Sequence, residues 1–343
     1  MKKFYLLVVF FLLTSVSCGS NYFDFNLYKS KREKILEDFA KGYIYLAYNQ
    51  TNKGIKYLEE GNKYLNDPYV DLYIAKIYLK KGKLDKALDI ALKAYKRSKD
   101  PRIAHFILMI YIQKKDFDNL IKFAIKAYQD NPDDKVLFHI LSVSLDPIKL
   151  FKMAQALENK DIKKSAFFYK LAGDIFLNNG KKAAAALAYY NAGLNYVYLS
   201  NYKEAIKLFK KAYELNKNNI EYINSLAYTY LLLGNIKEAE KYIKKLEKMN
   251  YQNNPSVLDT LAYYYYKIGD YKKALNFQKK AIKNNGSSAI LYAHLSLIYN
   301  ALGDKKNAKE YAKIALNMIK IDPSQALGEE KTIKEIKKIL KEE

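Results

Sequence analysis

Apolar side chains recur with the period of an α-helix along most of the chain. In residues 258–265 they follow the spacing i, i+3, i+4, i+7, which brings them onto one face of a helix. The members of this apolar stripe are Leu258, Leu261, Ala262 and Tyr265. Because a helix buries its apolar face, we expect this stripe to pack against neighbouring helices.

A second stripe of tyrosine and charged residues runs along the same predicted helix. Its members are spaced i, i+4, i+7, i+8 and lie about 100° around the helix axis from the apolar stripe. They are Asp259, Tyr263, Tyr266 and Lys267. The four consecutive tyrosines at 263–266 therefore point in different directions, and we expect only some of them in the core.

The helical pattern repeats with a period of 33 to 35 residues. Most units have a small residue, a tyrosine three positions later, a turn residue and then another small residue, and one unit has leucine at both small positions. The clearest units are Ala227-Tyr230-Gly234-Ala239, Ala262-Tyr265-Gly269-Ala274 and Ser296-Tyr299-Gly303-Ala308, and four further units place Asn49, Gly82, Lys115 and Ser200 at the turn. Several units end in helix-start signals such as Asp67-Pro68 and Asp100-Pro101. Each unit therefore predicts two amphipathic helices joined by a turn.

The repeated pattern resembles the tetratricopeptide repeat, and the resemblance covers nearly everything from about Ile35 to Pro323. It implies an all-α superhelical solenoid of antiparallel helix pairs, in which each pair covers an apolar face of the next. In that family the second stripe of the first helix lines a concave groove that binds a peptide or a partner's helix. The resemblance therefore implies a partner-binding groove that contains Tyr190, Asn224, Tyr228, Asp259, Tyr263, Tyr266 and Lys267.

The repeat register changes in the middle of the chain. Asp146-Pro147 falls where the first helix of one unit should end, and the next well-matched unit begins near Ala186. We expect an N-terminal repeat block at 34–158, an irregular helical segment at 159–181 and a C-terminal repeat block at 182–323. The irregular segment is either a bend or domain boundary, or an eroded repeat that stacks normally. The lysine-rich and glutamate-rich end, residues 324–343, is expected to form a capping helix.

The amino terminus has the layout of an export signal. A basic start precedes an apolar run that ends in small residues around Cys18, the only cysteine in the chain. The stretch Ser15-Val16-Ser17-Cys18 resembles a bacterial lipobox, although serine replaces the usual leucine. The resemblance implies a signal peptide at 1–17, palmitate or another acyl chain on Cys18, and a tether at 18–33. The alternative is an ordinary signal peptide with an incidental cysteine.

A lipid anchor implies a place in a bacterial cell envelope. No aspartate follows Cys18 directly, which favours the outer membrane by analogy with other lipoproteins. The anchored protein is expected to face either the periplasm or the cell surface.

The formal net charge of +23 comes almost entirely from lysine, because the chain contains only three arginines. Bidentate contacts to phosphate and guanine favour arginine, and the lysines are spread along the chain instead of gathering in a patch. We therefore expect no nucleic-acid partner. A general attraction to anionic surfaces is still expected.

The chain carries no recognisable catalytic or metal-binding motif. Its histidines, His105, His139 and His294, lie in separate repeat units, and the glycines occur singly at turns. His105 and His294 are expected to be partly exposed polar residues of first helices. The sequence predicts no enzyme, cofactor, metal or small-molecule substrate.

These observations predict a protein–protein interaction scaffold that binds a peptide or partner helix in the cell envelope. The rival hypothesis is a surface-exposed lipoprotein that binds an external protein or an anionic polysaccharide through its lysines.

Overall fold

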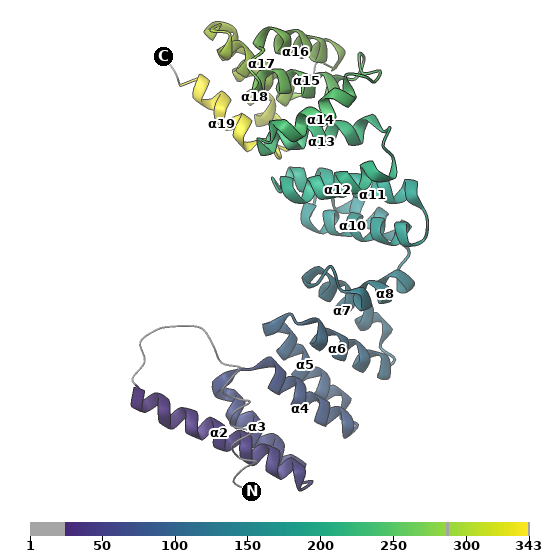
Figure 1. The fold of residues 1–343 in the computed structure, drawn as a ribbon, viewed down its shortest axis with the longest axis vertical. Helices are drawn as coiled ribbons and strands as arrows, with labels where there is room; N and C mark the ends of the chain where they lie inside the picture. The colour runs from purple at the N-terminus through teal and green to yellow at the C-terminus, as the bar shows by residue number, and fades with distance from the viewer. Residues whose placement is uncertain (1–24, 286–287, 342–343) are drawn as a thin grey trace. The chain divides into compact units, whose positions relative to one another are not determined.

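The computed structural model describes residues 25–285 and 288–341, which form eighteen α-helices and one short 3-10 helix without any β-strand (Figure 1). The prediction of an all-α repeat protein is confirmed. The expected signal peptide at 1–17 and Cys18 lie outside the described residues. The chain divides into two compact units, Met1–Ser144 and Leu145–Glu343.

The N-terminal unit consists of seven helices among its described residues, and each helix packs against the next. They are α2 (Phe25–Ala47), α3 (Thr51–Leu65), α4 (Pro68–Lys80), α5 (Leu84–Ser98), α6 (Pro101–Gln113), α7 (Phe117–Asp130) and α8 (Lys135–Ser144). Helix α2 begins at Phe25, so part of the segment expected as a tether at 18–33 is helical.

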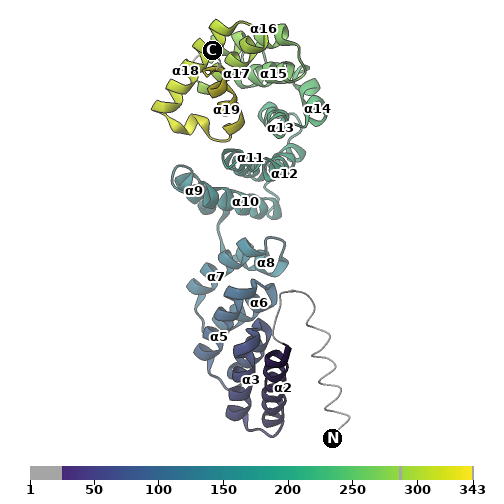
Figure 2. The same ribbon diagram turned by 90° about the vertical axis from the view of Figure 1, so that its left-hand side faces the viewer.

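The C-terminal unit continues the same arrangement (Figure 2). Its helices are α9 (Pro147–Leu157), α10 (Ile162–Asn178), α11 (Lys182–Tyr198), α12 (Tyr202–Leu215), α13 (Ile220–Leu233), α14 (Ile236–Leu246), α15 (Pro255–Lys267), α16 (Tyr271–Asn285), α17 (Ala289–Ala301), α18 (Lys305–Ile321), η1 (Pro323–Ala326) and α19 (Glu330–Ile339). Both views place α19, drawn in yellow, beside α17 and α18, against which it packs.

Local sequence signals explain where the helices begin and turn. The side chains of Asp67, Asp100 and Asp146 accept hydrogen bonds from the backbone near the start of α4, α6 and α9, and a proline follows each of them. All seven predicted turn positions have a positive φ, from 55° at Ser200 to 87° at Gly269. The repeat pattern therefore predicts the turn conformation even where the residue is not glycine.

The apolar stripe predicted for α15 is buried. Leu258, Leu261 and Ala262 are at most 1% exposed, and Tyr265 is 8% exposed. Small residues at the repeat positions, such as Ala274 and Ala281, are fully buried where helices approach each other closely.

The middle of the chain is helical. Helix α10 occupies most of residues 159–181 and packs against both α9 and α11, so this segment stacks on its neighbours. The division between the two units lies earlier, between Ser144 and Leu145. Asp146-Pro147 explains the shift, since it starts a new helix after α8 has run for only ten residues.

Within the described part of the chain, every helix is too short or too polar to cross a bilayer.

Candidate interaction surfaces

Helices α13, α15 and α17 bring four side chains of the C-terminal unit together. His294 Nδ1 lies 2.9 Å from Asp259 Oδ1. The ring of Tyr263 stacks on the imidazole with centroids 4.3 Å apart, and the ring of Tyr228 packs edge-on at 6.1 Å. We call these four residues the His294 cluster. The structure thus joins three predicted groove residues to a histidine that was not predicted to belong to the site.

The carboxyl-terminal end of the chain covers this cluster. We call residues 323–340, which comprise η1, the following turn and α19, the C-terminal strap. The hydroxyl of Tyr228 donates a hydrogen bond to Glu329 Oε1, and the hydroxyl of Tyr202 donates one to the carbonyl of Gly328 at 2.9 Å. The strap therefore crosses from the last repeat to helices α12 and α13, earlier in the unit.

The predicted groove is consequently closed in this unit. Asp259 and Tyr263 are only 7% and 4% exposed, where an open groove was expected. Tyr266 packs against the apolar cluster that the strap forms with α17 and α18. The physical reason is that α19 has its own apolar stripe, and this stripe is buried most effectively on the last repeat.

The remaining predicted groove residues have packing roles. Tyr190 lies between repeats, with ring centroids 5.1 Å from Tyr222 and 5.8 Å from Phe209. Asn224 is buried. The ammonium group of Lys267 lies 4.7 Å from the ring centroid of Tyr263, which gives a cation–π contact at the edge of the cluster.

Burial and charge shift the pKa values in the cluster. Burial alone would lower the pKa of His294, but the charge of Asp259 and its hydrogen bond outweigh burial, so the pKa is raised. Burial raises the pKa of Glu329, against the effect of nearby His294. Burial also raises the pKa of Tyr228 well above its usual range. The cluster therefore favours a protonated histidine paired with Asp259.

His294 was expected to be a partly exposed polar residue, and this prediction is wrong because the side chain is 1% exposed. The repeat alignment contained the missing signal. His294 occupies the position that Thr260 holds in the preceding repeat, and Thr260 is also 1% exposed.

No group of three histidine, cysteine, aspartate or glutamate side chains within residues 25–285 and 288–341 could hold a metal ion. His294 and Asp259 form a buried ion pair, and the rings of Tyr228 and Tyr263 pack against the imidazole. The chemistry of the cluster is suited to holding a carboxylate, which Glu329 supplies here.

The N-terminal unit presents a contrasting surface. Side chains from α2, α4 and α6 expose between 39% and 52% of their area along the first helices of three successive repeats. They are Tyr43, Tyr69, Tyr73, Met109 and Ile112, which we call the N-terminal stripe. The rings of Tyr43 and Tyr73 lie 5.7 Å apart, so the stripe is continuous between α2 and α4.

Equivalent repeat positions are thus covered in one unit and open in the other. In the repeat alignment Met109 and Ile112 match Tyr263 and Tyr266. Met109 is 39% exposed, whereas Tyr263 is 4% exposed.

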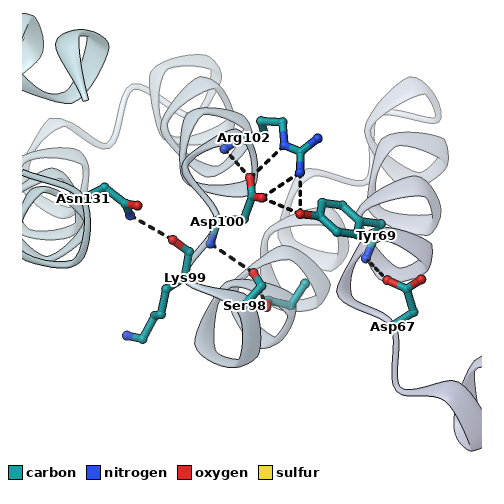
Figure 3. Close-up of polar contacts among 8 residues, drawn as sticks. Asp67, Tyr69, Ser98, Lys99, Asp100, Arg102 and Asn131 are labelled. Carbon is teal, nitrogen blue, oxygen red and sulfur yellow. Dashed lines mark hydrogen bonds and ion pairs between the residues drawn. The ribbon is translucent and has the colours of Figure 1, made fainter. Parts of the chain in front are cut away.

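A polar network holds one end of the N-terminal stripe (Figure 3). The carboxylate of Asp100 accepts hydrogen bonds from the Arg102 backbone at 2.8 Å and from the Arg102 guanidinium at 2.8 and 3.0 Å. The hydroxyl of Tyr69 also donates to Asp100, and the guanidinium lies 4.7 Å from the centroid of the tyrosine ring. Hydrogen bonds from Arg102 hold the pKa of Asp100 well below its usual range. The network therefore positions Tyr69 across the α4–α6 boundary.

Two tetratricopeptide repeat models match the sequence, one over residues 197–262 and the other over 255–287 and 289–321. These matches cover the repeats that contain α13 to α18. Comparison with curated proteins gives no match.

Several solved structures are similar at low identity. A tetratricopeptide repeat protein from Parabacteroides merdae is 18% identical, with a TM-score of 0.41 over 80% of this chain and 99% of its own. YrrB, described as a repeat protein of the same type with an unusual peptide-binding site, is 20% identical, with a TM-score of 0.35 over 59% and 95%. PilF of Pseudomonas aeruginosa is 18% identical, with a TM-score of 0.36 over 68% and 95%.

Proposed function

We propose that this chain, in which tetratricopeptide repeat models match residues 197–262, 255–287 and 289–321, is a non-catalytic adaptor that binds a partner's amphipathic helix on its N-terminal stripe. We further propose that a lipid on Cys18 anchors it in a bacterial envelope, with the outer membrane favoured. The observation that carries the first proposal is the exposure of Met109 and Ile112, at repeat positions that are covered in the other unit.

The chemistry of the N-terminal stripe suits an apolar helix face. Tyrosine and methionine supply large contact areas, and the flexible thioether adapts to irregular partners. A helix is the favoured form of the partner, because in the C-terminal unit the residues at equivalent positions lie beneath the turn and helix of the strap. The net charge of +23 favours a partner with acidic flanks.

Replacing both Met109 and Ile112 with aspartate tests the proposed surface. We expect the double variant to lose partner capture in cells, because two carboxylates would have to be desolvated against the partner's apolar face. Partner capture is measured by in-cell cross-linking and mass spectrometry, with photoactivatable side chains placed at Tyr43 and Tyr73.

Phe117→Asp provides the matched control. Phe117 is 60% exposed on α7, a second helix, outside the N-terminal stripe. The control variant should capture the same partner as the unaltered chain. Equal capture by the double variant, with unchanged circular dichroism, would reject the N-terminal stripe as the binding surface.

A surface-exposed lipoprotein that binds an anionic polysaccharide is a second candidate, favoured by the large excess of lysine. Protease treatment of intact cells separates the two proposals. Digestion of the protein supports the external ligand, and full protection supports the envelope adaptor.

A further inference from the structure

The two parts of the C-terminal strap make different contacts. Helix α19 buries Ile333, Ile336 and Ile339 in an apolar cluster with α17 and α18, as a capping helix does. The turn before α19 instead places a carboxylate against α13, where it accepts a hydrogen bond from Tyr228. Glu329, in this turn, is 5% exposed.

The turn fits closely against the helices beneath it. Gly328 has a φ of 78°, and a Cβ atom there would lie 2.6 Å from the carbonyl oxygen of Val197. Glu329 Oε2 accepts a hydrogen bond from Thr332 Oγ1 at 3.0 Å, and Oε1 accepts the bond from Tyr228. The site beneath the strap is thus built to hold a carboxylate on a sharply turned backbone.

A capping function does not require these polar contacts. Burying the Glu329 carboxylate costs desolvation free energy, and Asp259 already places one acidic group beside His294. Among the described residues, His294 Nε2 and Asn224 Oδ1 are buried without a hydrogen-bond partner. Polar groups that lower stability in this way are typical of recognition sites.

We propose that the C-terminal strap is an internal ligand, and that the surface beneath it is a second binding site for a partner of the same chemistry. That partner is an amphipathic helix whose apolar residues recur every third position and which is preceded by a turn carrying a glutamate. Its carboxylate takes the place of Glu329 and accepts the hydrogen bond from Tyr228 of the His294 cluster. The site goes beyond the proposed function, which uses the N-terminal stripe.

The full-length chain tests this proposal with a synthetic, fluorescein-labelled peptide of residues 323–341 as the probe. In Glu329→Ala, the strap loses its bond to Tyr228 and competes less well with the peptide. We expect the variant to bind the peptide about tenfold more tightly than the unaltered chain does, measured by fluorescence anisotropy. A peptide that itself carries Glu329→Ala should lose this affinity.

Hydrogen exchange of residues 327–340 reports the strap directly. We expect faster exchange of these amides in Glu329→Ala and unchanged exchange in the control Glu310→Ala, which alters an exposed glutamate of α18. Should Glu329→Ala fail to fold, Glu329→Gln keeps the shape of the side chain and removes its charge.

Three outcomes would overturn the proposal. The strap amides could stay as protected in the variant as in the unaltered chain. The strap could open while the peptide fails to bind at about 100 μM. The variant could form a dimer that excludes the peptide, which would assign the surface to a second copy of the chain. Met109 and Ile112 play no part in this experiment, so its result is independent of the N-terminal stripe.

Discussion

At the scale of single residues, burial of the two acidic groups depends on His294. Its imidazole pairs with Asp259 and interacts electrostatically with Glu329, and its raised pKa favours the charged form. A charged histidine in a protein core lowers the free energy of unfolding unless an opposite charge is paired with it. The sequence places His294 in a first helix, but only the tertiary packing brings it against Asp259 and buries it near Glu329.

Replacing His294 with leucine should lower the free energy of unfolding by about 3 kcal/mol, because two buried acidic groups lose their cation. Urea denaturation followed by circular dichroism measures this change. His139→Leu, on the exposed side of α8, should change stability by less than about 0.5 kcal/mol. Equal effects in the two variants would contradict the pairing.

The stability of the C-terminal unit should fall as pH rises above the unfolded pKa values of glutamate and histidine. Glu329 and His294 both have raised pKa values in the folded state, so the folded state holds their protons more tightly than the unfolded state. The stabilisation is full below the unfolded pKa of each group and is lost as pH rises through its folded pKa.

Urea denaturation at several pH values measures this dependence. The dependence should weaken in Glu329→Gln, which cannot titrate. A pH profile that is identical in this variant and the unaltered chain would rule out Glu329 as a contributor.

At the scale of the elements, close helix approach depends on residues without large side chains. Gly193 in α11 faces Phe209 in α12, and a Cβ atom built on Gly193 would lie 2.5 Å from the buried ring. In an open helix position alanine is better than glycine by about 1 kcal/mol. Here the overlap decides the outcome, because the ring has no free space around it.

Gly193→Ala should therefore destabilise the protein by about 1 to 2 kcal/mol in spite of its helix propensity. Thermal unfolding measures the change. The double variant Gly193→Ala with Phe209→Leu should show a favourable coupling, because the smaller side chain admits the new methyl group. If Gly193→Ala were more stable than the unaltered chain, α11 and α12 would be able to move apart without cost, and the prediction would be wrong.

The sequence predicts most elements well for a local reason. Caps such as Asp100 and turns such as Gly269 depend on residues within a few positions of each other. The division between Ser144 and Leu145 was harder to predict, because the helices on its C-terminal side, such as α10, keep a helical pattern and pack against their sequence neighbours. Hydrophobic periodicity predicts that a segment is helical, but it does not predict which other helix the segment packs against.

At the scale of the whole chain, equivalent repeat positions differ in solvent exposure between the two units. The strap covers Tyr263 in the C-terminal unit, whereas Met109 remains exposed in the N-terminal unit. The exposure of a repeat position therefore depends on whether another segment of the chain reaches it.

The proposed anchor also belongs to this scale. Cys18→Ala should move the protein from the membrane fraction to the soluble fraction and abolish palmitate labelling, because the acyl chains supply the membrane affinity. Cell fractionation and radiolabelling measure the two effects. Ser17→Ala leaves the cysteine in place and should keep both. Labelling that persists in Cys18→Ala would reject the lipid anchor.

The sequence by itself determined the helical class, the repeat period, the turn positions and the apolar stripe, because each depends on spacing along one or two helices. Only the tertiary structure decided which tyrosine side chains are exposed to solvent. Glu329 and Tyr228 are 101 residues apart, and their contact arises because the strap buries its own apolar face. No periodic pattern contains that contact, since it depends on the free energy of packing between distant segments.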